Sequence, residues 1–60
     1  MDRLFDVFVK SGGATVIMLR SADLETAVAH AQQIAQKQGR TAFILNKATR
    51  AIQEFRPAER

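Results

Sequence analysis

Residues 14–20, with the sequence ATVIMLR, decide how this chain of 60 residues folds. A strand with one face in water alternates apolar and polar side chains, but residues 16–19 form an unbroken apolar run. The run therefore predicts a β-strand that needs apolar cover on both of its faces. The segments on either side of it must show what provides that cover.

The residues before this run predict the first half of a β-hairpin. Residues 3–10 alternate in hydrophobicity, and Phe8 is an apolar residue on the otherwise polar face. Gly12 and Gly13 follow Ser11, and glycine readily adopts the positive φ that a tight hairpin turn requires. Residues 15–19, which include β-branched side chains, then return as the second strand.

A helix is expected over residues 22–38, a length of about 25 Å at 1.5 Å per residue. Ser21 is the expected N-cap, and Asp23 and Glu25 lie in the first turn, where negative charge is favourable. Gly39 suits the left-handed position that ends a helix. An apolar stripe at helical spacing indicates the buried face: Leu24, Ala27, Val28, Ala31, Ile34 and Ala35.

Two more strands are expected after the helix. Residues 41–46 contain a second two-sided apolar stretch, and residues 50–56 end at Pro57, which cannot donate to a ladder. In the last strand Ala51, Gln53 and Phe55 share one face; Arg50, Ile52, Glu54 and Arg56 share the other. The sequence therefore predicts one α+β domain over residues 1–60, with β-β-α-β-β order and one helix packed on one face of a four-stranded sheet.

One helix covers only one face of such a sheet, so we expect a homodimer. A chain this short has a small core, and it contains no cysteine to form a disulfide. A second copy would bury the helix-free faces or continue the sheet across a two-fold axis. The alternative is a monomer whose loops and C-terminal tail cover this face. The interface candidates are Phe8, Val16, Met18, Ile44 and Ile52.

The formal net charge of +3 lies entirely in the last third of the chain. Residues 1–39 have four bases and four acids, whereas residues 40–60 have five bases and two acids. This asymmetry suggests DNA or RNA as a partner, with contacts mainly to the phosphate backbone, and its alternative is a solubilising tail. Arg50 and Arg56 share a face of the last strand, and Lys47 and Arg40 lie at strand or helix ends, so they form a cationic stripe if that strand is near an edge. Glu54 in the middle of the stripe weakens this prediction. The candidate contacts are Arg40, Lys47, Arg50 and Arg56.

No pattern in the sequence predicts catalysis, a cofactor or a metal site. His30 is the only histidine and lies at the edge of the apolar stripe, and no cysteine or phosphate-binding loop accompanies it. No segment is long and apolar enough to span a membrane, and the N-terminus is unlike a secretory signal. We therefore expect a cytoplasmic, non-enzymatic protein without membrane partners.

The stretch DLETAVAHAQQIAQKQGRTAFILNKATRAIQEFRP resembles the helix-strand-strand half of small bacterial β-β-α-β-β proteins of unknown function, and the resemblance covers residues 21–57. In those proteins a capped, alanine-rich helix ends in a Gln-Gly stop and is followed by a strand, a turn and a polar last strand. Their usual turn glycine is absent here, where Ala48, Thr49 and Arg50 stand. The resemblance implies the topology and no activity.

These observations lead to two functional hypotheses. The first is a homodimer that binds nucleic acid through the basic residues of the C-terminal third. The alternative is a protein-interaction module, or accessory subunit, that presents its apolar sheet face or an open strand edge to another protein. Steep loss of binding with salt is expected for the first hypothesis and salt-tolerant binding for the second.

Overall fold

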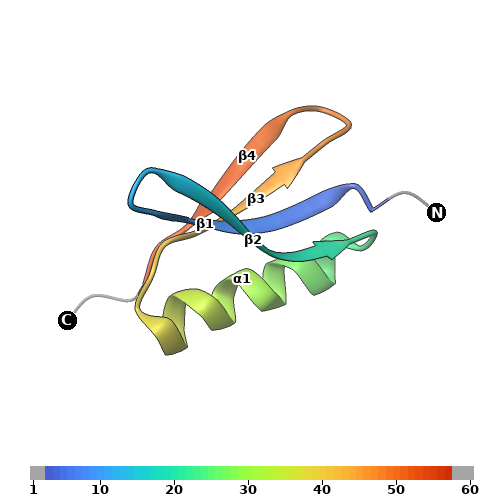
Figure 1. The fold of residues 1–60 in the computed structure, drawn as a ribbon. Coiled ribbons are helices and arrows are strands. Elements are labelled where there is room, and N and C mark those ends of the chain that lie inside the picture. Colours follow the sequence, from blue (N-terminus) through green and yellow to red (C-terminus); the bar gives the residue numbers. More distant parts are fainter. Residues whose placement is uncertain (1–2, 58–60) are drawn as a thin grey trace.

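An antiparallel sheet with a helix across one face makes up the computed structural model, which describes residues 3–57 (Figure 1). The elements are β1 Phe5–Ser11, β2 Ala14–Ser21, α1 Leu24–Gln38, β3 Ala42–Asn46 and β4 Ala51–Phe55. The strand order is β2-β1-β3-β4, so β2 and β4 form the edges. The predicted fold is confirmed. The predicted tail beyond Pro57 lies outside the described residues.

The core lies between α1 and the two central strands. Val7 and Val9 of β1 and Ile44 of β3 are almost fully buried against the helix. The helix contributes Ala27, Ala31, Ile34 and Ala35, as the apolar stripe predicts. Alanine side chains are short, which lets the helix lie close to the sheet. Leu24, at the start of the stripe, remains exposed.

The apolar run of β2 is explained by an irregular register rather than by cover on both faces. Val7 lies opposite Leu19, but its neighbour Phe8 lies opposite Ile17, so Met18 is an extra residue at a bulge. The bulge shifts the alternation by one residue, and apolar side chains then follow one another without a polar one between. As an edge strand, β2 leaves Val16, Ile17 and Met18 substantially exposed.

The helix begins later than the sequence predicts, and its N-cap is Asp23 rather than Ser21. The Asp23 carboxylate accepts hydrogen bonds from the Thr26 N–H at 3.1 Å and the Thr26 hydroxyl at 2.8 Å. Ser21 still ends β2, and its hydroxyl accepts from the Asp23 N–H at 3.0 Å. Two residues of chain are needed to turn from the strand into the helix, which moves the cap from Ser21 to Asp23.

The connections that follow α1 depend on two residues with positive φ. Gly39 ends the helix with φ of 62°, as predicted from its position. Arg50 also has φ of 62°, although it is not a glycine. Its N–H donates to the Asn46 carbonyl at 2.6 Å and closes the β3–β4 turn. Arg50 thus occupies a conformation that glycine adopts most easily.

Candidate nucleic-acid interface

Two stacked aromatic rings lie at the centre of the sheet face that the helix leaves open. Phe8 of β1 and Phe43 of β3 are opposite one another in the ladder, with ring centroids 5.2 Å apart and an interplanar angle of 17°. Phe8 is only 8% exposed, whereas Phe43 is partly accessible. Phe8 therefore packs against one face of the Phe43 ring, and the part of the Phe43 ring that stays accessible is the aromatic surface available to a partner.

Two cationic side chains lie beside these rings at one end of the sheet. The Lys10 ammonium lies 5.5 Å from the centroid of the Phe43 ring, a cation–π geometry. Arg56 follows β4 and pairs with Glu54, with 3.3 Å between its Nε and Oε2. Glu54 is opposite Phe43 in the β3–β4 ladder. The aromatic centre thus has a cation on β1 and another beyond the end of β4.

Asp6 and two cations form a further charged cluster at the other end of the face. The Asp6 carboxylate is buried, and its Oδ1 lies 3.5 Å from Lys47 Nζ and 3.9 Å from Arg20 Nε. That oxygen has no hydrogen-bond partner. Lys47 and Arg20 both remain substantially exposed. One carboxylate therefore holds two cations, and the group has a surplus positive charge that faces solvent.

Positive charge is concentrated on this face and not on the helix layer. The open face has four cations and two carboxylates, a balance of +2: Lys10, Arg20, Lys47, Arg56, Asp6 and Glu54. The helix and its cap carry Asp23, Glu25 and Lys37, a balance of −1. The remaining positive charge of residues 3–57 comes from Arg3, Arg40 and Arg50, which belong to neither group.

The four predicted contact residues do not form one stripe. Lys47 and Arg50 lie in the β3–β4 turn, whereas Arg40 precedes β3 and Arg56 follows β4 at the opposite end. A five-residue strand of about 17 Å separates the two pairs. Lys47 and Arg56 also take part in ion pairs. The four predicted contact residues are therefore divided between the two ends of the β3–β4 hairpin, and their role in binding stays a prediction.

The predicted interface residues divide between the two faces of the sheet. Phe8 and Ile52 lie on the open face, and Met18 is the bulged residue. Val16 is opposite Val9 on the helix side, and Ile44 is 2% exposed in the core. Ile44 is therefore not available to a partner of the open face. Its neighbours Phe43 and Leu45 are the residues of β3 that face outward.

Sequence reasoning missed Lys10, Arg20 and Phe43 as members of one surface. Lys10 and Phe8 are two residues apart on one strand and therefore share a face, which is a signal in the sequence. That Phe43 lies beside Phe8 depends on the pairing of β1 with β3, whose strands are separated by the second strand and the helix. No local pattern reports this pairing.

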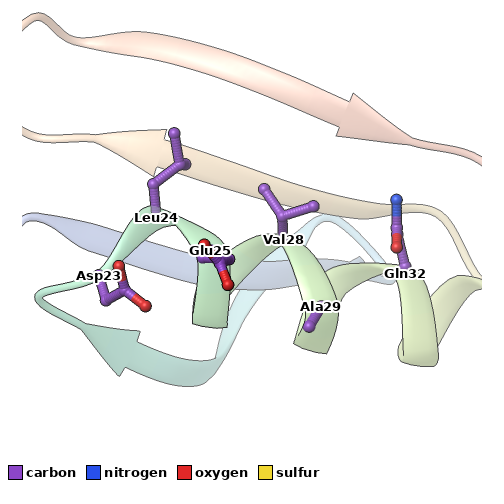
Figure 2. Close-up of a pocket in the computed structure, with 6 residues that line it drawn as sticks. All are labelled: Asp23, Leu24, Glu25, Val28, Ala29 and Gln32. Carbon is purple, nitrogen blue, oxygen red and sulfur yellow. The ribbon is translucent and has the colours of Figure 1, made fainter.

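The described residues show no constellation with catalytic geometry. His30 is partly buried on α1, and no group of three metal-ligating side chains occurs within residues 3–57. An open groove of about 600 Å³ runs along the helix flank, lined by Leu24, Val28, Gln32 and three neighbours (Figure 2). Its carboxylates Asp23 and Glu25 are at the helix start, where Asp23 serves as the cap. The absence of catalysis stays a prediction.

Comparison with known proteins provides no evidence on function, so a proposal must rest on the fold and on the surface of this chain. The chain matches no protein-family model, no curated protein and no solved structure. Its resemblance to small bacterial β-β-α-β-β proteins therefore stays a prediction. Within residues 3–57, α1 is the sole helix, and it is neither long nor apolar enough to cross a membrane.

Proposed function

We propose that the open sheet face binds single-stranded nucleic acid without catalysing a reaction on it. The observation that carries this proposal is the partly exposed Phe43 ring, central on the sheet and beside the Lys10 ammonium. Four-stranded sheets that bind single-stranded RNA stack bases on aromatic residues of this kind. An aromatic surface among cations is also the common arrangement in proteins that bind single strands without sequence preference.

Each part of the face has a separate task in this proposal. A base stacks on Phe43, and the buried Phe8 keeps that ring in place. Lys10 and the Asp6-centred cations Arg20 and Lys47 contact phosphates on either side of the stacked base. Phosphate contacts contribute affinity without sequence information, so binding is expected to be tolerant of sequence.

The role of Phe43 is tested by fluorescence anisotropy with labelled single strands of about 10 nucleotides, a length within the site sizes of such domains. We expect Phe43→Leu to weaken binding about 5- to 150-fold, because stacking contributes about 1–3 kcal/mol per base. Phe55→Leu makes the same substitution on the helix side of the sheet and is the matched control. Equal affinity of Phe43→Leu and the wild type would contradict base stacking.

Salt dependence tests the cations independently of the aromatic ring. Binding should fall steeply between about 50 and 200 mM salt, and Lys10→Gln should make that dependence shallower by about one phosphate contact. Lys37→Gln removes an equal charge from the last turn of α1 and should leave the slope unchanged. A Lys10 variant with the wild-type slope would exclude this residue from phosphate binding.

A protein partner for the same face is the second candidate function. Ile17 lies opposite Phe8 and Ile52 lies opposite Leu45 on the same face, and because they are 43% and 61% exposed they extend the aromatic pair into an apolar patch. Such a patch with a charged rim is the common anatomy of a protein interface. Failure to bind any single strand at low salt, together with salt-tolerant capture of a protein partner, would favour this function.

A further inference from the structure

The outer side of β4 is an open sheet edge. β4 pairs with β3 on one side, and no strand of the described residues lies on its other side (Figure 1). Its side chains are exposed from Ala51 to Glu54, and Ile52 is the most exposed large apolar residue within residues 3–57. Unpaired backbone N–H and C=O groups along such an edge can pair with a strand of another chain.

Charge complementarity selects one way for β4 to pair with its own copy. An antiparallel pair related by a two-fold axis places residues of the same face opposite one another. With the axis at Ile52, each Ile52 meets its copy, and Arg50, the turn residue directly before β4, comes level with Glu54 of the second copy, within reach of its long side chain. Two such oppositely charged pairs form, one on each side of the axis, and directly opposed unlike charges stabilise a sheet.

The neighbouring registers are less favourable. With the axis at Gln53, Ile52 lies opposite a copy of Glu54, and Arg50 lies opposite a copy of Arg56. With the axis at Glu54, the two Glu54 carboxylates oppose one another. Like charges directly opposite destabilise a strand pair. The charges of β4 and its flanking residues therefore favour the register centred on Ile52.

The other edge offers no comparable fit. β2 is interrupted by the bulge at Met18, and bulges are a common way to prevent pairing of an edge. Arg20 is the single charged residue of β2, so a copy of β2 has no carboxylate to place opposite it. A second copy is thus better matched to β4 than to β2.

We propose that β4 pairs antiparallel with β4 of a second copy about a two-fold axis at Ile52, with Arg50 beside Glu54 of the other chain. The product is a homodimer with a continuous eight-stranded sheet. Both helices lie on one side of it, and the two aromatic faces lie on the other. This proposal does not depend on nucleic-acid binding, because the face that carries Phe43 remains open in the dimer.

A charge exchange tests the proposed register. Sedimentation velocity at about micromolar and at high micromolar concentration should show a dimer of the 6.7 kDa chain at the higher concentration. Arg50→Glu alone and Glu54→Arg alone should each shift the equilibrium at least tenfold toward monomer. The double variant Arg50→Glu, Glu54→Arg should restore it, because both intermolecular pairs are rebuilt with reversed sign.

Restored dimerisation in the double variant would show that residues 50 and 54 pair between chains and not within one chain. Arg50 precedes β4, three strand residues separate it from Glu54, and the ion pair that Glu54 makes within its own chain is with Arg56. Arg40→Glu is the matched charge control and should not alter assembly. A wild type that stays monomeric at high micromolar concentration, or a double variant as monomeric as the single ones, would overturn the proposal.

Ile52→Lys provides a second test at a regular strand position. It places two ammonium groups at the axis and should abolish the dimer, while circular dichroism verifies that the monomer is folded. A folded Ile52→Lys variant that still dimerises would exclude this axis. Nucleic-acid binding measured on the same monomer distinguishes the two proposals, because loss of assembly leaves Phe43 and Lys10 in place.

Discussion

At the start of α1 a single carboxylate determines where the helix begins. Asp23 accepts hydrogen bonds from the hydroxyl and then the N–H of Thr26, and both hold the pKa of Asp23 below its usual value near 3.8. Because the unfolded chain has the ordinary pKa, the ionised cap stabilises the fold fully above that value. The stabilisation is lost as the pH falls through the lower folded-state pKa.

We therefore expect Asp23→Ala to lower the melting temperature at pH 7, and the difference from the wild type to shrink near pH 2.5, about one unit below the ordinary pKa. Thermal circular dichroism at the two pH values measures this. Glu25→Ala removes a carboxylate from the same turn without removing the cap, and it should have the smaller effect at pH 7. An Asp23→Ala difference that is the same at both pH values would exclude an ionic cap.

The β3–β4 turn is an element whose geometry conflicts with its sequence. Arg50 holds φ of 62° at the position before β4, where glycine is more easily accommodated. We expect Arg50→Gly to stabilise the fold by about 0.5–1 kcal/mol, or a few degrees in melting temperature. The melt is measured at low protein concentration, where a second copy has dissociated.

Gly39 has the same φ as Arg50, and its replacement by alanine is the opposite change, from glycine to a residue with a Cβ. A Cβ added at Gly39 meets no atom within 4 Å, so the positive φ is the main contribution to the change in the free energy of unfolding. Gly39→Ala should therefore destabilise the fold by about 1 kcal/mol. If Gly39→Ala and Arg50→Gly both changed stability in the same direction, backbone strain would not be the explanation for either turn.

For the whole molecule, the two faces of the sheet differ in what they contribute to stability. Ile44 is 2% exposed beneath the helix, and Ile→Ala in a core costs about 2–5 kcal/mol. A core of this size supplies about 3–5 kcal/mol. We therefore expect Ile44→Ala to be largely unfolded at 25 °C, as circular dichroism and urea titration would show.

Ile17→Ala is the matched substitution on the open face. Ile17 is opposite Phe8 and 43% exposed, so its loss leaves a much smaller cavity than the loss of Ile44. This variant should remain folded with a modest reduction in stability. An Ile17→Ala variant as unfolded as Ile44→Ala would mean that the open face is part of the core.

The sequence by itself determined the order of the elements, because hydrophobic period, turn glycines and the terminal proline act over a few residues. It also determined that β4 alternates, with Ile52 and Glu54 on one face and Gln53 and Phe55 on the other. Within the candidate site, Lys47 and Arg56 were found from charge alone. The N-cap Asp23 was not found in this way, because Ser21 is also a residue type that commonly caps helices.

Only the tertiary structure decided which strands are neighbours and therefore which side chains form a surface. The pairing of β1 with β3 brings Phe8 to Phe43, and the bulge at Met18 sets which apolar residues of β2 face the helix. Ile44 and Leu45 are equally apolar in sequence, yet one is core and the other faces outward. Contacts between strands distant in sequence fix this choice, because a shift of one residue exchanges the two faces.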